Sequence, residues 1–197
     1  GFGQVFNGPA QRQLVLGVQA IRAARAEAQS VLKRLQALPV GEQGAIEYRQ
    51  LEPRTQRLKL FLGQAERARL GEAMSAAHAR IEGSLAADVR AQEDRLATTP
   101  STQDGARTLV EWENAFNERF GDFGTAPSVQ HARQTLADTR AKVMQALLPA
   151  WKTQVARMPG TATEVAARRA ELAALFGPAA GQGTPLYAEF KASLDAR

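Results

Sequence analysis

Apolar residues recur along this chain at intervals of three and four positions, a spacing that predicts amphipathic helices. The first predicted helix covers residues 9–38, with Pro9 at its first position and Pro39 directly after it. Its inward positions are predicted to be Leu14, Val18, Ile21, Ala28, Leu32 and Leu35. A narrow apolar stripe of this kind is typical of a helix that packs against neighbouring helices.

The same reading predicts six further helices. Their ranges are 42–62, 66–98, 101–120, 127–158, 162–176 and 185–197. We expect Pro53 and Pro149 to bend the helices that contain them. The expected inward positions are Met74, Ala77, Ile81, Leu85, Val89 and Leu96, then Leu109, Trp112, Phe116 and Phe120, then Val129, Leu136, Val143, Leu147, Trp151 and Val155. Helices of about 30 residues therefore alternate with shorter ones.

Three landmarks recur in a fixed order at intervals of about 60 residues. The first is a Phe closely followed by Gly, at Phe2, Phe61, Phe120 and Phe176. The second is an Arg in an Ala-rich stretch, at Arg22, Arg80, Arg140 and Arg197. The third is a Pro that ends a helix, at Pro39, Pro100 and Pro159. Interleaved landmarks of this kind predict tandem repeats.

The predicted fold class is therefore all-α, built from helical-hairpin repeats of about 60 residues in about three units. The boundaries follow the Arg landmarks: a partial repeat at 1–22, and repeats at 23–80, 81–140 and 141–197. Because the last repeat stops within a helical pattern, we expect the array to be part of a longer one.

Two packings would satisfy these helix lengths. The hairpins could stack side by side as an α-solenoid. Alternatively, each long helix could pack one half on the preceding short helix and the other half on the following one, an arrangement that resembles spectrin-type arrays. The second is favoured because the segments from a Phe landmark to the next Arg landmark, and from that Arg to the next Pro, are each about 20 residues long, which matches a short helix. No spectrin motif is present.

Each landmark has an expected structural role. The Phe is expected to be buried at a helix end, with the Gly just beyond it as a cap. The Arg is expected to bind helix-end carbonyls or acids of the neighbouring unit, and partner binding is the alternative. Trp112, Trp151, Phe116 and Phe120 are expected to form core rather than an aromatic ligand patch.

Charge adds one candidate interaction site. The net charge is +5, and residues 1–70 hold 11 Lys and Arg against 5 acids. The candidate partner-binding residues are Arg49, Arg54, Arg57, Lys59, Arg67 and Arg69. They could contact nucleic acid or an anionic membrane surface. However, Glu47, Glu52 and Glu66 lie among them and the later units lack such a cluster, so a solvated face is favoured.

Candidate chemistry is sparse. The chain has no Cys and two histidines, His78 and His131, which are not equivalent within the repeat. The carboxylates in Glu111/Glu113 and Glu93/Asp94 point apart on a helix. No nucleotide-binding, nucleophile-elbow or zinc-protease motif occurs. We therefore expect no catalytic site, no metal and no cofactor.

These observations favour a non-enzymatic scaffold, spacer or protein–protein interaction segment within a larger protein. The first alternative is binding of nucleic acid or an anionic membrane surface through residues 49–69. The second is a regulatory helical arm of an enzyme whose catalytic domain lies elsewhere. No stretch is apolar enough to span a membrane. The excess of Arg over Lys, with abundant Ala, suggests a bacterial source.

Overall fold

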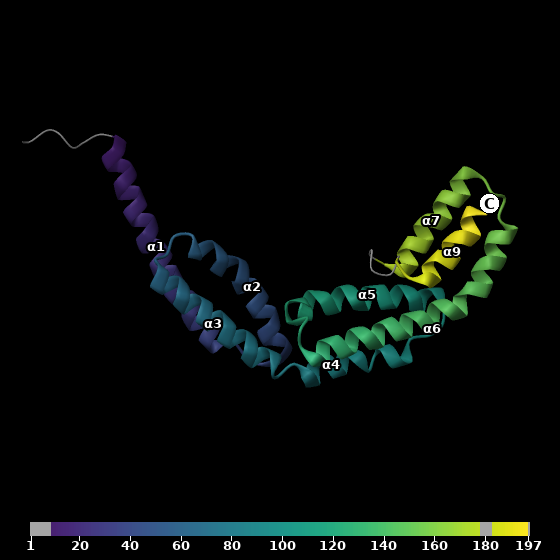
Figure 1. Ribbon diagram of the computed structural model, residues 1–197, viewed down its shortest axis with the longest axis horizontal. Helices are drawn as coiled ribbons and strands as arrows, with labels where there is room; N and C mark the ends of the chain where they lie inside the picture. Colours follow the sequence, from purple (N-terminus) through teal and green to yellow (C-terminus); the bar gives the residue numbers. More distant parts are fainter. Residues whose placement is uncertain (1–8, 178–182, 197) are drawn as a thin grey trace, which may run out of the picture. The chain divides into compact units, whose positions relative to one another are not determined.

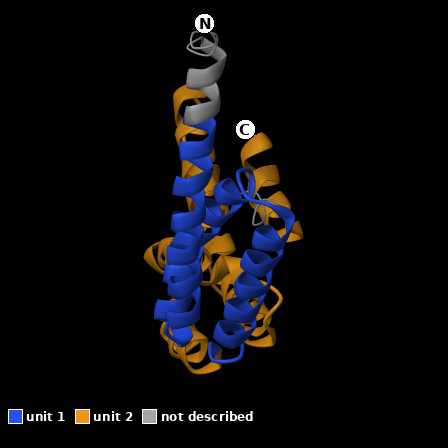
Figure 2. Ribbon diagram, turned by 90° about the vertical axis from the view of Figure 1, so that its left-hand side faces the viewer, with its two compact units in different colours: residues 1–85 blue, residues 86–197 orange. Residues whose placement is uncertain are grey.

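The computed structural model describes residues 9–177 and 183–196, and side chains from residue 16 onward. These residues form helices and connecting turns, with no strand among them. The chain divides into two compact units, residues 1–85 and residues 86–197 (Figure 2). The expected all-α fold is confirmed.

Unit 1 is a bundle of three helices. They are α1 (Pro9–Ala37), α2 (Gly41–Lys59) and α3 (Gln64–Glu82), and each packs against the other two (Figure 1). The buried side chains of α1 begin at Ala24 and continue through Ala28, Val31 and Leu35. Their spacing of three and four residues matches the heptad-like stripe of a packed helix. Among the side chains of α1 that the structure describes, from residue 16 onward, those of the second half therefore contribute to this core.

The Ser84 hydroxyl group connects two segments of this bundle that are far apart in the sequence. The Ser84 side chain accepts a hydrogen bond from the Gly41 backbone nitrogen at 2.7 Å and donates one to the Ile81 carbonyl at 2.7 Å. Gly41 has a φ of +73°, a conformation that glycine adopts without strain. The turn between α1 and α2 is thereby tied to the end of α3.

The prediction of one helix over residues 66–98 is wrong. The structure has α3, a turn over residues 83–85, α4 (Ala86–Glu93) and the 3-10 helix η1 (Leu96–Thr98). Gly83 disfavours helix and the Ser84 hydroxyl competes for the Ile81 carbonyl, which explains the interruption. The apolar period continues across the turn, so the pattern alone did not reveal it.

Unit 2 is a helical bundle in which one long helix contacts most of the other elements. Besides α4 and η1, its elements are α5 (Gln103–Phe120), the 3-10 helix η2 (Gly121–Phe123), α6 (Pro127–Arg157), α7 (Ala162–Phe176) and α9 (Pro185–Asp195). The long helix α6 packs against α4, α5 and α9, and α7 packs against α5 and α9 (Figure 1). On α6, His131 contacts Glu93 of α4 and Arg140 contacts Glu113 of α5. Trp151, farther along the same helix, contacts Phe190 of α9.

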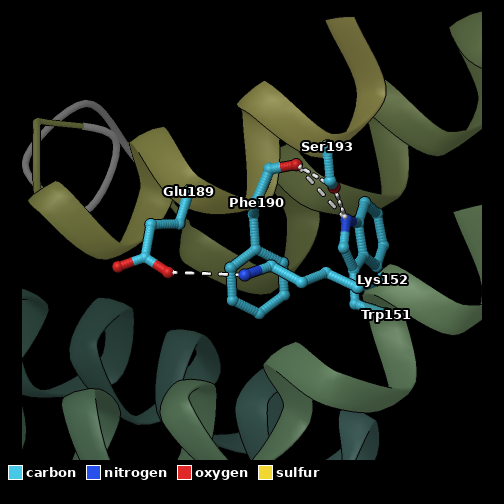
Figure 3. A network of polar contacts seen from close by, with 5 residues as sticks. All are labelled: Trp151, Lys152, Glu189, Phe190 and Ser193. Carbon is cyan, nitrogen blue, oxygen red and sulfur yellow. Dashed lines mark hydrogen bonds and ion pairs between the residues drawn. The ribbon is translucent and has the colours of Figure 1, made fainter. Parts of the chain in front are cut away.

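The contact between α6 and α9 is anchored by a buried indole (Figure 3). Trp151 is 2% exposed, and its Nε1 donates to Ser193 Oγ at 3.0 Å and to the Phe190 carbonyl at 3.3 Å. Lys152 Nζ lies 3.7 Å from Glu189 Oε2 on the exposed side of the same contact. Helix α6 continues through Pro149, as α2 continues through Pro53. Pro149 therefore does not end the helix.

Several inward positions differ from those expected in α1 and in the landmark Phe residues. Val18 and Ile21 are 47% and 42% exposed, because they precede the part of α1 that meets α2 and α3. Phe61 is 55% exposed, whereas Phe120 and Phe176 are buried. Phe2, Arg197 and the Leu14 side chain lie outside the described residues.

The glycine that follows each Phe also varies in its role. Gly177 caps α7 with a φ of +73°, as expected of a C-terminal glycine. Gly121 has a φ of −56° and leads into η2, and Gly63 has a φ of −70° and begins α3. The predicted C-terminal cap is therefore wrong at Gly63. At Gly121 the glycine does follow the last residue of α5, and its N–H donates to the Asn117 carbonyl, but without the left-handed backbone seen at Gly177.

Candidate functional site

The six basic candidate residues are distributed around two helices of unit 1. Arg49, Arg54, Arg57 and Lys59 lie on α2, and Arg67 and Arg69 lie on α3. A helix turns about 100° per residue, so Arg54 lies about 140° around α2 from Arg49, and Lys59 about 80° away in the opposite direction. On α3 the two arginines lie about 160° apart. The residues therefore point in several directions rather than forming one basic face.

Acidic neighbours offset part of this charge. Arg54 Nε lies 2.5 Å from Glu27 Oε1, and both side chains are about two-fifths exposed. Arg25 Nε likewise lies 2.9 Å from Glu66 Oε1. Ion pairs at this exposure contribute little to stability, but they lower the local positive potential. The geometry gives the nucleic-acid and membrane alternatives no additional support.

An apolar surface is the more distinctive feature of unit 1. The large apolar side chains with high exposure among the described residues all belong to this unit: Leu16 64%, Val18 47%, Ile21 42%, Val40 58%, Leu60 80% and Phe61 55%. Three of them lie in the first half of α1. Clustered exposed apolar residues commonly mark interaction sites.

A groove of about 330 Å³ joins this part of α1 to the end of α2. Ala20 and Ala24 line one wall, and Leu58 and Phe61 line the other. Glu27, Arg54 and Arg57 also line the groove. The lining of the groove therefore combines apolar side chains with three charged ones.

The exposed residues of α1 occupy more than one side of the helix. Leu16 and Ala20 lie about 40° apart on the groove side, at about 100° of rotation per residue. Val18 and Ile21 lie about 60° apart from each other and more than about 130° from Leu16. A helix that is apolar on several sides is typical of one that neighbours cover from more than one direction. We call residues 16–22 of α1, together with Phe61, the α1 surface.

Two of the recurrent arginines make specific contacts. Arg80 Nη2 donates to the Leu35 and Leu38 carbonyls, each at 3.1 Å, at the end of α1. Arg140 Nη2 donates to Glu113 Oε2 at 2.6 Å, and these side chains are only 12% and 17% exposed. The kinds of partner, helix-end carbonyls and an acid, are those expected from the sequence, but the expectation that they belong to the neighbouring unit is wrong. Arg80 and its partners all lie in unit 1, and Arg140 and Glu113 both lie in unit 2. Arg22 is exposed on α1.

Unit 2 contains an apolar cavity of about 390 Å³ that the sequence did not reveal. Helices α5 and α6 form most of its wall, and the end of α7 and the start of α9 complete it. Its side chains include Phe116, Leu136, Met144 and Phe176. Cavities of this size and character are typical of small-molecule sites. These residues appeared only as a helical apolar stripe, so no sequence signal distinguished a cavity from solid core.

The two histidines lie in different environments and in different units. The His78 ring contacts Tyr48 with centroids 5.6 Å apart, and its Nδ1 lies 3.6 Å from Glu82 Oε2. His131 Nε2 lies 3.3 Å from Glu93 Oε1, the atom that also accepts a hydrogen bond from Thr135 at 2.5 Å. Within the described ranges, no three His, Asp or Glu side chains are grouped to hold a metal ion.

In the part of the chain that the structure describes, no helix is both long and apolar enough to cross a lipid bilayer. No protein-family model, curated protein or solved structure matches the chain significantly.

Proposed function

We propose that this chain is a non-enzymatic segment of a helical repeat array that serves as a scaffold, and that the α1 surface is its protein-interaction site. The observation that carries the proposal is that Leu16 is 64% exposed, whereas the positions that match it in the later repeats are buried. Repeats bury their apolar faces only against neighbours, so an exposed face of this kind favours a helical partner.

The proposed repeat rests on matched positions that share the spacing of the Pro landmarks. Pro39, Pro100 and Pro159 define steps of 61 and 59 residues. With the same steps, Leu35 matches Leu96 and Val155, and all three are at most 2% exposed. Ala24 likewise matches Leu85 and Met144, which are all buried. These two positions are thus buried in all three long segments, which are α1, residues 66–98 and α6.

The same steps of 61 and 59 residues also match the first half of α1 with positions in the two later segments. Leu16 matches Ala77 in α3 and Leu136 in α6, which are 1% and 4% exposed. Leu136 lies in the part of α6 that faces α4 and α5, and Ala77 lies where α3 packs on α1 and α2. The first half of each later long segment thus packs on two helices of its own unit. We therefore infer that the α1 surface binds two helices in the same way.

The Arg landmarks do not follow this register. Arg22 matches Gly83 and Lys142, and Arg140 matches Ile81, when the steps of the Pro landmarks are applied. A continuous helix such as α1 or α6 keeps one register along its length. Arg80 and Arg140 therefore occupy different positions in the register that the Pro landmarks define, and they also have different partners. For this reason we base the proposed repeat on the Pro landmarks.

A fusion of the chain with its own hairpin tests this proposal. The fusion consists of residues 86–126 followed directly by residues 7–197, so that a copy of α4, η1 and α5 precedes α1 at the position that matches α6. We expect amide hydrogen exchange across residues 16–22 to slow by at least tenfold relative to the parent chain, because two helices would cover α1.

Two variants of the fusion provide the controls. Leu16→Glu places a charge in the proposed interface and should restore fast exchange. Leu60→Glu changes an 80% exposed residue outside α1 and should leave the protection in place. Equal exchange in the fusion and the parent chain would reject docking at the α1 surface.

A further inference from the structure

The cavity of unit 2 combines an apolar interior with an excess of positive charge. Its charged lining residues are Arg133, Arg140 and Glu113, and the apolar remainder includes Phe116, Leu136, Ala137, Met144, Phe176 and Leu186. A cavity of about 390 Å³ is large enough for a small organic ligand. The lining therefore carries one more positive than negative side chain.

One of the two arginines is buried and incompletely paired. Arg140 uses Nη2 to contact Glu113, and its side chain is 12% exposed. Its Nε is the buried side-chain nitrogen or oxygen, within the described portion, that has no hydrogen-bond partner. Burying a guanidinium with an unpaired N–H donor costs free energy. A negatively charged group near Arg140 would lower that cost.

The second arginine is exposed and is held in position by neutral groups. Arg133 Nη2 donates to Asn117 Oδ1 at 3.1 Å, so this contact leaves its positive charge uncompensated. Its guanidinium also lies next to Gly124, where a β-carbon would come within 3.0 Å of Nη1. Arg133 is thus directed to the wall of the cavity while its charge remains available to a ligand.

We propose that this cavity binds an amphiphile with an apolar chain and one carboxylate head group. The apolar chain would lie against Phe116, Leu136 and Met144, where it gains the free energy of leaving water. The carboxylate would lie near Arg133, whose guanidinium suits carboxylate recognition. This site lies within unit 2 and is independent of the proposed interaction site on α1.

Calorimetric titration of the full chain with decanoate, below the concentration at which it forms micelles, tests the proposal. We expect decanoate to bind at least tenfold more tightly than decanol and than decyltrimethylammonium, which have the same chain length. Arg133→Gln should remove most of that preference. Arg157→Gln, an exposed residue of α6 outside the cavity, is the matched control and should retain it.

Variants that fill the cavity test its location. Ala137 and Ala141 line the cavity and are exposed, so Ala137→Phe and Ala141→Phe should fill space without displacing the core. Each should weaken decanoate binding at least tenfold. As a second measurement, decanoate should shift the methyl NMR signals of Met144 and Leu136 but not that of Met74 in unit 1. Absence of binding, equal affinity for the three amphiphiles, or shifts away from Met144 would overturn the proposal.

Discussion

Gly105 lies so close to Pro100 that a β-carbon at position 105 would come within 1.9 Å of the Pro100 carbonyl oxygen. Gly44 has the same relationship to Pro39, at 2.1 Å. In both cases the glycine follows the proline by five residues and lies in the first turn of a short helix. The close approach lets α2 and α5 turn back sharply on the helix before them. The third landmark, Pro159, is followed at the same distance by Glu164, so this contact belongs to the first two turns.

Gly105→Ala and Gly44→Ala should therefore destabilise the protein. The added methyl group would meet a backbone carbonyl that cannot move independently, and overpacking of this kind costs about 1–3 kcal/mol. Gly71→Ala is the matched control, because a β-carbon there meets no atom within 4 Å. It should stabilise α3 by about 0.5–1 kcal/mol through its higher helix propensity. Urea unfolding of the three variants measures these differences. Equal stability of all three would contradict this explanation.

Phe120→Ala and Phe61→Ala should differ strongly, although both residues are landmarks of the sequence. Phe120 is fully buried with its ring 5.0 Å from that of Phe116, so its removal should cost about 3–5 kcal/mol. Phe61 is 55% exposed, and its removal should change stability by no more than about 0.5 kcal/mol. Differential scanning calorimetry distinguishes these cases. A large loss for Phe61→Ala would mean that its side chain is covered in solution.

Arg80→Met should weaken the end of α1. The arginine satisfies the Leu35 and Leu38 carbonyls and places positive charge at the helix C-terminus, so we expect a loss of about 1–2 kcal/mol. Arg69→Met, at an exposed position of the same helix, should have little effect. Faster amide exchange near the α1–α2 turn in Arg80→Met alone would identify the site of the loss, and equal effects of the two variants would argue against a capping role.

The Glu113–Arg140 pair should follow the pattern of a buried ion pair. Glu113→Leu or Arg140→Met alone leaves the other charge largely buried, so each should cost about 3–5 kcal/mol. The double variant removes both charges and should lie within about 1 kcal/mol of the parent chain. A double-mutant cycle measured by chemical unfolding gives the coupling energy. Additive single effects would show that the pair does not act as a unit.

Changing Arg54, Arg57 and Lys59 together to Ala should leave the fold of unit 1 intact. Arg57 is exposed and Arg54 and Lys59 are only partly buried, and alanine favours helix. Circular dichroism melting checks the fold, and titration with duplex DNA and with phosphatidylserine vesicles checks the two alternative functions. We expect that neither duplex DNA nor the vesicles bind the parent chain in a salt-sensitive way that is lost in the triple variant. Such a loss would favour a nucleic-acid or membrane role over the scaffold.

The sequence by itself determined the all-α class and most helix ends. Helices follow local periodicity, and Pro9, Pro39, Pro127 and Pro159 act on the backbone next to them, so these features can be read without the fold. The buried stripe of α6 was likewise visible from Val129 to Val155.

Only the tertiary structure decided which apolar positions are covered. Val18 and Ile21 continue the stripe of α1 yet remain exposed, because burial depends on which helices pack alongside. The turn at residues 83–85 depends on a hydroxyl that also binds Gly41, 43 residues away. The cavity beside Arg140 arises where four helices meet without filling the space. Each of these features depends on contacts between segments distant in the chain, and a local pattern carries no information about such contacts.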